Sequence, residues 1–472
     1  MSFPDAARLL GADLLFPCPS RSIEGGSIDT RTLQPGDLFV ALRGERDDGH
    51  RHLEEAFRKR ASGALIDRGF FAAGRDRSFK NPGEVFQNLL PVADPEKALA
   101  RLADRVRSSV SLAAVGITGS VGKTTTKEFL HFILRQKYPV LANPGNFNNY
   151  LGLPLTLLRL DKNHRFCIAE LGANHSGEIR ALAGLLKPAA AIITAIAPAH
   201  LEGFGTLEKI MDAKLELAEA LPSNAPLVIP DDDPGLFQKA RRFGLKIIRV
   251  GQSREADCRI SAVRVRGSRV SFVLNQKREY AFPGIAGFLA RNAAMAVAMA
   301  EALGVGPEEI PEVWEGLTFP AGRFQECRIG EIRVIHDGYN ANPASFEKAL
   351  EAFSALEIAG RKILVFADML ELGSEEKKCH EELGRKIARS HLDYTLAYGP
   401  RAAVSVEVLR KEMPGFAAEH FSSPDEITVF LNHWLRPGDA VLLKASRGMK
   451  IERILDALRE RETDAFCRPR NL

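Results

Sequence analysis

The sequence lacks any apolar run that approaches the roughly 18 residues needed to cross a bilayer, so we expect no membrane span. Its first twenty residues also lack a basic head followed by a long apolar stretch, which argues against a secretory signal. Cysteine is scarce and no C-x-x-C pair occurs, which argues against a disulfide framework and a zinc site. We therefore expect reduced thiols and a cytoplasmic location. The six cysteines are Cys18, Cys167, Cys258, Cys327, Cys379 and Cys467.

The sequence also lacks a large excess of either charge, since the net charge is only +4 over 472 residues. No block of like charges or of basic residues interleaved with aromatics occurs, so we expect no nucleic-acid partner. Hydrophobic residues make up 45% of the chain and charged residues 26%, as in ordinary globular proteins. A chain of this length exceeds a single core, which predicts two to four domains.

Three patterns of apolar periodicity follow one another and predict an α/β protein of three domains. Residues 1–93 alternate short apolar runs with turn signals, which indicates a small α/β unit. Residues 94–321 contain buried-strand runs separated by helices near 123–136 and 206–221, typical of a doubly wound, mostly parallel sheet, followed by antiparallel hairpins and an alanine-rich helix. Residues 322–472 repeat the strand–helix alternation, with helices near 343–355, 375–389 and 450–463, and predict a Rossmann-like sheet.

The strongest local signal is a strand, a glycine-containing turn and a helix in AAVGITGSVGKTTTKEFL. Backbone N–H groups and a helix N-terminus cradle phosphates in such a turn. Ile117 stands where the general P-loop has its first glycine, so the match is to a shorter T-G-x-x-G-K-T form. Lys123 would neutralise the terminal phosphates of ATP, and the Thr124 hydroxyl would bind magnesium. The predicted ATP-binding residues of the turn are Thr118, Gly119, Ser120, Val121, Gly122, Lys123, Thr124 and Thr125.

Two further candidates follow predicted strands, where open α/β sheets place ligand-binding groups. Glu170 ends the run RFCIAE, and its carboxylate is an ordinary magnesium ligand. His200 follows ITAIAPA, and a histidine there is as readily a packed or capping residue as a metal ligand.

Seven blocks in order over nearly the whole chain resemble the Mur ligase family. They are TGSVGKTTTK, NPGNFNNYLGLPLTLL, AELGANHSGEI, HLEGFGTLEKIMDAKLELAEAL, DGYNANPASFEKAL, ADMLELGSEEKKCHEELG and LKASRGMKIERI. HLEGFGT and the Tyr339–Pro343 run are similar to the member of the family that adds D-alanyl-D-alanine to UDP-N-acetylmuramoyl-tripeptide, and the D-N-P-R signature of the preceding ligase is absent. The resemblance implies a UDP-sugar-binding domain over 1–93, a central ATPase over 94–321 and a C-terminal ligase domain over 322–472.

The resemblance also implies roles for single residues. Thr124, Glu170 and His200 would hold two magnesium ions, and Lys214 would be carbamylated by carbon dioxide; only an unprotonated amine can react in this way. The catalytic set is thus expected to be Lys123, Lys214, His200 and Arg323. Arg323 would contact the γ-phosphate, Asp337 the ribose, and Asn292 the nucleotide. The bland alternatives are a solvated helix lysine, a surface arginine and a turn aspartate.

Substrate contacts follow from the same resemblance. For the UDP moiety these are Thr30, Arg31 and Arg43, although an Asp-Thr-Arg turn occurs in many proteins. For the muramoyl peptide and the dipeptide they are Asn146, Asn148, Asn149, Tyr339, Asn340, Asn342 and Ser446. The asparagine run admits a turn interpretation as well. The partners expected are the UDP-muramoyl tripeptide and D-alanyl-D-alanine, bound by a monomer.

Four positions depart from the family's pattern. Phe288 and Leu289 stand where the family has histidine and asparagine, which leaves the adenine contacts open. His336 precedes Asp337 where an acidic residue is common, and Ala445 stands where glycine usually precedes Ser446. The sequence also leaves open whether the third residue of the tripeptide is lysine or diaminopimelate.

The expected reaction is ATP-dependent ligation through an acyl phosphate, because a carboxylate at neutral pH is too poor an electrophile to acylate an amine directly. Two alternatives stay within the superfamily: a diaminopimelate- or lysine-adding ligase and a folylpolyglutamate synthase. A P-loop switch or scaffold that binds ATP without ligation is a third alternative, and it leaves Glu170, His200 and Lys214 unexplained.

Overall fold

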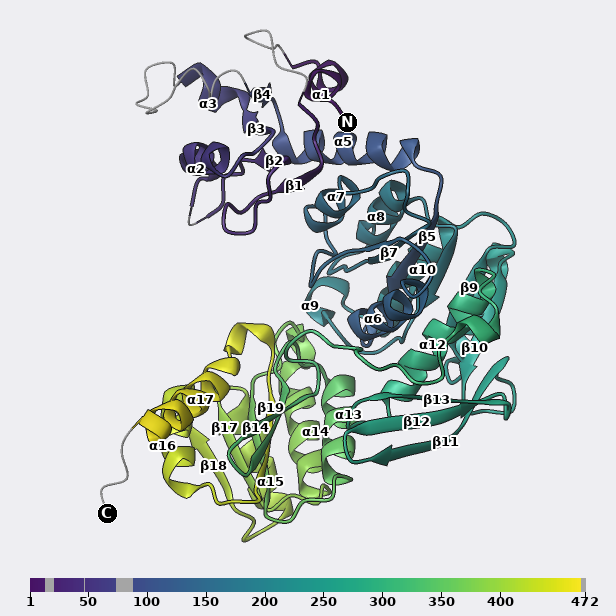
Figure 1. The fold of residues 1–472 in the computed structure, drawn as a ribbon. Helices are drawn as coiled ribbons and strands as arrows, with labels where there is room; N and C mark the ends of the chain where they lie inside the picture. Colours follow the sequence, from purple (N-terminus) through teal and green to yellow (C-terminus); the bar gives the residue numbers. More distant parts are fainter. Residues whose placement is uncertain (13–20, 46, 74–87, 468–472) are drawn as a thin grey trace.

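The computed structural model describes residues 1–12, 21–45, 47–73 and 88–467 and contains three β-sheets stacked one after another along the molecule (Figure 1). The α/β class and the three-sheet arrangement predicted from the sequence are confirmed. Among the described helices, none is both long and apolar enough to span a membrane. Cys167, Cys258, Cys327 and Cys379 are free thiols, whereas Cys18 lies outside the described residues.

The N-terminal sheet has four parallel strands in the order β1-β2-β3-β4. Its strands are short and buried, and β2 with the sequence DLFV is enclosed on both faces. The elements are α1 (Phe3–Leu10), β1 (Gly25–Ser27), β2 (Asp37–Val40), α2 (Leu53–Arg58), β3 (Gly63–Asp67), α3 (Arg68–Ala73), β4 (Leu89–Val92) and α5 (Pro95–Ser109), with the 3-10 turn η1 at Gly49–His52.

Helix α5 joins this sheet to the central one. It begins where the Asp94 side chain accepts the N–H of Lys97 and Pro95 occupies the first turn, two typical helix-start features. Its buried stripe packs in one continuous apolar cluster with residues of both the N-terminal and the central sheet. The Arg159 side chain adds an ion pair of 2.8 Å to the buried Asp37 carboxylate across this boundary.

The central sheet has nine strands in the order β13-β12-β11-β10-β9-β8-β5-β7-β6. All neighbours are parallel except the β11-β12 and β12-β13 hairpins, as the sequence predicts. The strands are β5 (Ala113–Thr118), β6 (Val140–Ala142), β7 (Phe166–Glu170), β8 (Ala190–Ile193), β9 (Pro226–Pro230), β10 (Lys246–Gly251), β11 (Cys258–Arg266), β12 (Arg269–Leu274) and β13 (Arg278–Pro283). The helices are α6 (Lys123–Leu134), α7 (Gly152–Leu157), α8 (Glu178–Leu186), α9 (Leu201–Phe204), α10 (Leu207–Glu219), α11 (Pro234–Ala240) and α12 (Leu289–Ala302), with 3-10 turns η2 (Arg241–Phe243) and η3 (Pro307–Glu309).

The strand order reverses at β5, which lies between β8 and β7 although β6 follows it in sequence. Ligands bind at such reversals, beyond the carboxyl ends of the strands. The alanine-rich α12 packs against α6, and small side chains allow this close approach. Trp314 completes the core beside them, with ring centroids 5.3 Å from Phe129 and 5.7 Å from Phe282.

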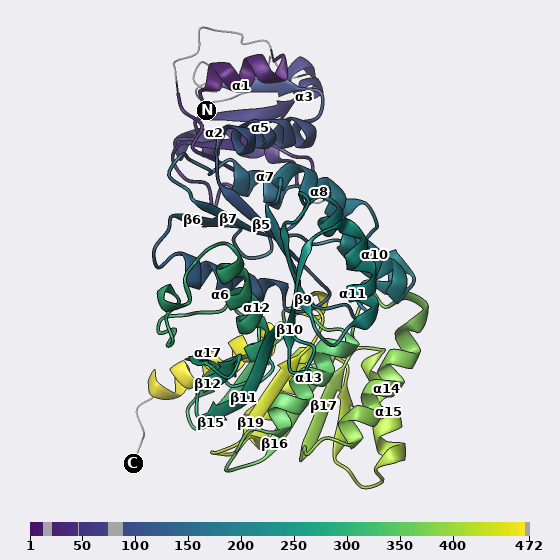
Figure 2. The same cartoon turned by 90° about the vertical axis from the view of Figure 1, so that its right-hand side faces the viewer.

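The C-terminal sheet has six strands in the order β14-β15-β19-β16-β17-β18, parallel apart from β14-β15. The rotated view in Figure 2 shows its helices α13, α14 and α15 on one side of the sheet. The elements are β14 (Gln325–Ile329), β15 (Ile332–Asp337), α13 (Pro343–Ser354), β16 (Lys362–Ala367), η4 (Gly373–Glu375), α14 (Glu376–Ala388), β17 (Tyr394–Tyr398), α15 (Ala402–Glu412), β18 (Ala418–Phe421), α16 (Pro424–Trp434), β19 (Ala440–Lys444), η5 (Arg447–Met449) and α17 (Glu452–Cys467).

Candidate active site

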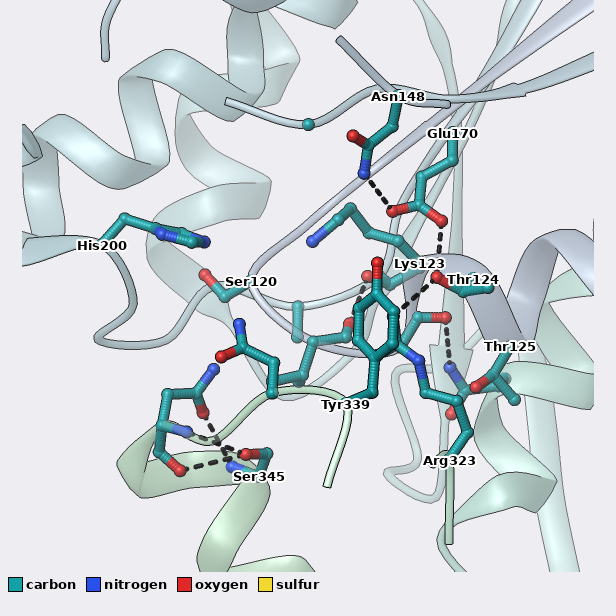
Figure 3. Close-up of a pocket in the computed structure, with 18 of the residues that line it drawn as sticks. Ser120, Lys123, Thr124, Thr125, Asn148, Glu170, His200, Arg323, Tyr339 and Ser345 are labelled. Carbon is teal, nitrogen blue, oxygen red and sulfur yellow. Dashed lines mark hydrogen bonds between the residues drawn. The ribbon is translucent and has the colours of Figure 1, made fainter. Parts of the chain in front are cut away.

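A cavity of about 500 Å³ lies where the central and C-terminal domains meet. Its lining comes from the turn after β5, the segment before α7, the ends of β7 and β8, the start of α12 and the start of the C-terminal domain (Figure 3). The predicted site residues that line it are Ser120, Val121, Gly122, Lys123, Thr124, Thr125, Asn148, Asn149, Glu170, His200, Asn292, Arg323, Asp337, Tyr339, Asn340 and Asn342.

The turn between β5 and α6 requires two of its glycines. Gly119 has φ +144° and Gly122 has φ +85°, regions that residues with a side chain rarely adopt. An added Cβ would lie 2.1 Å from the Thr194 hydroxyl oxygen at the first position and 2.3 Å from the Asn292 amide nitrogen at the second. Neighbouring side chains therefore leave no room for a side chain at either position, and the turn can present its backbone N–H groups at the start of α6.

Side chains around the turn fix its backbone rather than point into the cavity. The Thr118 hydroxyl donates to the Leu171 carbonyl at 2.9 Å, and the Ser120 hydroxyl donates to the Ala197 carbonyl at 2.8 Å. Asn292 donates from its amide to the Gly122 carbonyl at 3.0 Å and to the Thr126 hydroxyl at 2.9 Å. Thr118 and Gly119 do not line the cavity, so their contribution to it is the shape of the turn.

Lys123 is the first residue of α6 and its ammonium donates to the Gly119 carbonyl at 2.7 Å. The amine therefore folds back over the turn, next to the space where phosphates would lie (Figure 3). Burial lowers its pKa, while the nearby Glu170 carboxylate raises it. A cation that is partly stripped of water at the start of a helix attracts an anionic ligand strongly.

Two oxygen-bearing side chains that could bind a metal, Thr124 and Glu170, lie side by side near Lys123. The Thr124 hydroxyl donates to Glu170 Oε2 at 2.6 Å, and the Asn148 amide donates to Glu170 Oε1 at 2.8 Å. Glu170 is 2% exposed, so this carboxylate is oriented by two hydrogen bonds in a nearly dry environment. A hydroxyl and a carboxylate oxygen side by side suit Mg²⁺, which binds one or two protein oxygens together with phosphate and water.

Arg323 reaches this pair from the beginning of the C-terminal domain. Its Nη2 donates to the Thr124 hydroxyl at 3.0 Å, and its guanidinium lies 3.8 Å from the centre of the Tyr339 ring. Within the described chain its Nε is buried and has no hydrogen-bond partner. A buried, unsatisfied guanidinium N–H costs free energy and indicates an anionic ligand that completes it.

His200 lies at the start of α9 in a left-handed backbone conformation, with φ +53°. Its Nδ1 is hydrogen-bonded to the Glu371 carboxylate of the C-terminal domain. Thr124, Glu170 and His200 thus line the same cavity. No cluster of three or more acidic, histidine or cysteine residues close enough to hold a metal forms in the described chain.

Lys214 lies on α10 and is 3% exposed, so it is not the solvated helix lysine of the alternative interpretation. Its ammonium lies 5.2 Å from the centre of the Phe204 ring and does not line the cavity. Burial, and then the positive charge of Lys123, lowers its pKa to about 7. A large fraction of this amine is therefore unprotonated at neutral pH.

Asp337 ends β15 and anchors the C-terminal side of the cavity. Its Oδ1 accepts the N–H of Phe324 at 3.0 Å, and its Oδ2 accepts the ammonium of Lys444 at 2.5 Å. Lys444, at the end of β19, is fully buried and lines the cavity. Sequence reasoning missed Lys444, although its place at a strand end was the same signal that singled out Glu170.

The Tyr339–Pro343 run leads into α13 at the cavity's edge. Asn342 is the N-cap of α13, where its side chain accepts the N–H of Ser345 at 2.9 Å. The Asn340 side chain accepts the N–H of Ala341 at 2.9 Å. Ser446 is 3% exposed, does not line the cavity and binds the Leu370 N–H and the Ala341 carbonyl instead.

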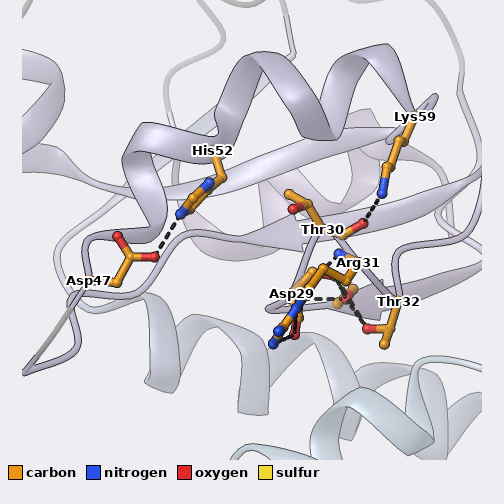
Figure 4. A network of polar contacts seen from close by, with 8 residues as sticks. Asp29, Thr30, Arg31, Thr32, Asp47, His52 and Lys59 are labelled. Carbon is orange, nitrogen blue, oxygen red and sulfur yellow. Dashed lines mark hydrogen bonds and ion pairs between the residues drawn. The ribbon is translucent and has the colours of Figure 1, made fainter. Parts of the chain in front are cut away.

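The predicted UDP contacts lie away from this cavity, on the N-terminal domain (Figure 4). Arg31 is 85% exposed and pairs with Asp29 at 2.6 Å; the hydrogen bond from Arg31 lowers the pKa of Asp29 to about 2. The Thr30 carbonyl accepts the Lys59 ammonium at 2.7 Å. Arg43 is exposed and lies 3.9 Å from the carboxylates of Asp48 and Asp67.

The asparagine run before α7 divides between the cavity and its surroundings. Asn148 and Asn149 line the cavity, whereas Asn146 does not. The Asn149 side chain also accepts the N–H of Gly152 at 2.9 Å, so the turn interpretation holds for part of its hydrogen-bonding capacity.

Comparison with known proteins covers each of the three domains. Residues 22–107 match the model described as "Mur ligase family, catalytic domain", residues 117–300 the "Mur ligase middle domain" and residues 322–447 the "Mur ligase, glutamate ligase domain". A Bacillus subtilis UDP-N-acetylmuramoyl-tripeptide–D-alanyl-D-alanine ligase is 34% identical over 439 residues, 93% of each chain. The chain belongs to the Mur ligase family. The resemblance stated from the sequence blocks is thus confirmed.

Solved Mur ligases agree with the fold over nearly the full length. A crystal structure of MurF from Acinetobacter baumannii aligns with a TM-score of 0.82 at 28% identity and covers 97% of this chain and 98% of its own. MurF from Thermotoga maritima in complex with ADP aligns with a TM-score of 0.75 at 28% identity, over 94% and 99%. The Mur ligase fold therefore extends through all three domains.

Proposed function

We propose that this chain is an ATP-dependent ligase that joins D-alanyl-D-alanine to UDP-N-acetylmuramoyl-tripeptide. The contact of Thr124 with both Glu170 and Arg323 carries the chemistry, because it brings a metal-binding pair and a cation from another domain to the phosphate turn. Full-length likeness to dipeptide-adding ligases and the Tyr339–Pro343 run beside the cavity support the choice of amino substrate.

The cavity's residues fit a nucleotide phosphate and magnesium. Lys123 and the unsatisfied Nε of Arg323 supply positive charge on two sides, and Thr124 with Glu170 supplies adjacent oxygen donors. We assign Thr124, Glu170 and His200 as the residues that would hold two magnesium ions. When bound, magnesium would neutralise the phosphate oxygens and lower the barrier to nucleophilic attack.

The reaction starts with the terminal carboxylate of the tripeptide. One of its oxygens attacks the γ-phosphorus of ATP, the bond to the β-phosphate oxygen breaks, and ADP leaves with an acyl phosphate formed. The free amine of the dipeptide then attacks the acyl carbon, loses a proton, and the tetrahedral intermediate collapses to amide and phosphate. This chain needs to supply no nucleophile. Lys123 and Arg323 position the reactants and stabilise negative charge.

Other residues have positioning roles in this proposal. Asn292 and the two glycines with positive φ shape the phosphate turn, and Asp337 would face the ribose, with Lys444 fixing its carboxylate. A carbamate on Lys214 would turn a buried cation into an anion, and its pKa of about 7 makes the required neutral amine abundant. Phe288 and Phe324, whose ring centres lie 5.5 Å apart at the cavity wall, supply an apolar surface for a base.

The N-terminal domain is proposed to hold the UDP moiety through Thr30, Arg31 and Arg43. Arg31 and Arg43 are exposed and pair with carboxylates of the same domain, so they can turn toward a diphosphate at little cost. The domain limits proposed are 1–93 for UDP-sugar binding, 94–321 for ATP binding and 322–472 for the ligase domain.

A substrate panel tests the proposal. Purified protein would be given ATP, magnesium and one of three substrate sets: UDP-muramoyl tripeptide with D-alanyl-D-alanine, the UDP-muramoyl acceptor one residue shorter with diaminopimelate or lysine, or a folate with glutamate. We expect ADP release with the dipeptide only, and a pentapeptide product by mass spectrometry. ADP release with diaminopimelate or with a folate and glutamate would instead support one of the alternative ligases, and nucleotide binding without release would support a switch.

A further inference from the structure

The block ADMLELGSEEKKCHEELG reaches the active site although, in the described chain, none of its residues from 368 to 384 lines the cavity. It follows β16, forms the turn η4 and enters α14. Its one polar contact with the cavity's lining is made by the Glu371 carboxylate, which binds His200 across the domain boundary. The proposed reaction assigns no role to this segment.

Buried polar side chains fix the first part of this segment. The Asp368 carboxylate, 1% exposed, accepts the N–H groups of Arg401 at 3.1 Å and Ala402 at 2.8 Å at the start of α15. His380, fully buried on α14, accepts the N–H of Met369 at 3.1 Å through Nε2 and donates from Nδ1 to the Glu376 carbonyl at 2.8 Å. The loop is therefore held from two helices at once.

Ser446 adds a third support. Its hydroxyl accepts the N–H of Leu370 at 2.9 Å and donates to the Ala341 carbonyl at 3.3 Å, and its own N–H donates to the Asp368 carbonyl at 3.2 Å. The loop is thereby tied to the segment that leads into α13. Two consecutive N–H groups are fixed immediately before Glu371, so the backbone that carries this glutamate has little freedom.

The backbone then turns toward the central domain. Glu371 has φ +63° and Gly373 has φ +55°, both in the left-handed region. The Glu371 carbonyl accepts the N–H of Glu202 at 3.2 Å, and a Cβ added at Gly373 would lie only 3.2 Å from the Glu202 Cα. The loop thus seats on the first turn of α9, directly after His200.

We propose that Glu371 is a positioning residue for His200. Its carboxylate accepts the Nδ1 proton of the imidazole, which leaves the lone pair on Nε2 and fixes the ring in the cavity wall. A carboxylate that binds one nitrogen of a histidine sets which tautomer is present and raises the basicity of the other nitrogen. Because Glu371 belongs to the C-terminal domain, His200 is oriented only when that domain is docked.

The consequence for catalysis rests on the proposed function, in which His200 would help to hold magnesium, and Nε2 is the ring nitrogen that the contact with Glu371 leaves free to do so. Domain docking would then do two things at once: bring Arg323 to Thr124 and select the competent tautomer of His200.

Four variants test this role. Glu371→Ala removes the acceptor, and Glu371→Gln keeps an acceptor oxygen without the charge. Gly373→Ala keeps the carboxylate but crowds the loop against Glu202. Glu375→Gln is the matched control, because Glu375 lies on the same segment, outside the cavity, and its one ion pair in the part of the chain that the structure describes is with Lys378, at 3.6 Å.

We expect Glu371→Ala to lower kcat by about 10–100-fold, as for other carboxylate partners of functional histidines, with the KM for ATP within about twofold of wild type. Glu371→Gln and Gly373→Ala should fall between wild type and Glu371→Ala, and Glu375→Gln should match wild type. Glu371 is half-exposed, so melting temperatures should change little.

A second readout does not depend on activity. Nitrogen-15 NMR of histidine-labelled, ligand-free protein reports the tautomer, with the His200 signals assigned by their loss in His200→Gln. We expect protonated Nδ1 in wild type and a mixture or protonated Nε2 in Glu371→Ala. An unchanged tautomer, or an unchanged kcat, in Glu371→Ala overturns the proposal. If wild type releases no ADP with any amino substrate, the proposed function fails while the NMR result still decides the role of Glu371.

Discussion

The phosphate turn of the central domain and the proposed UDP contacts of the N-terminal domain both use polar side chains, but the surroundings of these side chains differ. Around the turn, Glu170 is 2% exposed and Thr124 3%, and neighbouring side chains orient them. Arg31 is 85% exposed, and the hydrogen bonds described for its side chain go to Asp29, two residues away. The turn is preorganised by the protein, whereas the Arg31 side chain lies largely in solvent. The first should therefore govern kcat and the second the KM for the UDP substrate.

The largest effect is expected from Lys123→Ala. Removing the cation beside the phosphate turn should lower kcat by at least about 10²–10³-fold, the usual cost of losing one group that stabilises transition-state charge. Phosphate release would measure the loss. The melting temperature should stay near that of wild type, because the lysine side chain is only partly buried and its ammonium bonds the turn itself, at the Gly119 carbonyl. Activity equal to wild type would contradict the assignment of the turn.

The second largest effect is expected from removal of carbon dioxide, which should lower activity if the buried Lys214 is carbamylated. With a pKa of about 7, roughly nine tenths of the amine is protonated at pH 6 and only about one tenth at pH 8. At equal concentrations of dissolved carbon dioxide, depleted enzyme should therefore regain activity about tenfold more slowly at pH 6 than at pH 8. Intact-mass spectrometry of the active enzyme with a free Lys214 amine, or activity indifferent to carbon dioxide, would count against a carbamate.

Arg31→Ala tests the other half of this comparison, the exposed residues proposed to contact UDP in the N-terminal domain. We expect the KM for the UDP substrate to rise about tenfold, which corresponds to about 1.4 kcal/mol, with kcat unchanged. Since Arg31 is exposed, the effect should shrink as salt is raised from 0.05 to about 0.5 M, whereas that of Lys123→Ala should not. Arg8→Ala is the matched control, because Arg8 is 80% exposed and pairs with Asp5 in the same domain. A fall in kcat would break the proposed division of roles.

The smallest effect is expected at Asn342, where the role as helix N-cap must be distinguished from a contact with the dipeptide. Asn342→Ala removes the N-cap of α13 and should lower the free energy of unfolding by about 0.5–2 kcal/mol. Asn342→Asp keeps the cap and should leave stability near wild type. Chemical denaturation measures both. If both variants raise the KM for the dipeptide more than that for ATP, Asn342 contacts the dipeptide; equal effects on the two would contradict this.

The same contrast explains how far the sequence could be used. Long apolar runs such as AAVGIT and KILVFA predict the central strands of the sheets correctly, because burial on both faces dominates their composition. Short or edge strands were not predicted: β6 has three residues and none is fully buried, and β18 has one buried residue in four. Their pairing is set by neighbouring strands rather than by their own side chains.

The site divides in a similar way. The phosphate turn was predicted because its chemistry is local, with two glycines, a lysine and a threonine within six residues. Glu371 and Lys444 were missed because their partners lie 171 and 107 residues away. Ser446 was assigned to substrate, yet its hydroxyl is used in joining two loops. The sequence identifies a polar residue near a site but does not distinguish a ligand contact from a support.

The buried pair of Lys444 and Asp337 has a consequence for how mutants are judged. Replacing Asp337 alone would strand an ammonium with no counter-charge in the interior, which typically costs about 3–5 kcal/mol. A poorly folded or inactive Asp337→Ala protein would then report this stranded charge and not the affinity for ribose. The double variant Asp337→Ala with Lys444→Met removes both charges, so it separates the effect of the carboxylate on the nucleotide from the cost of an unpaired buried charge. In homologues, we expect a substitution at one of these two positions to be accompanied by a substitution at the other.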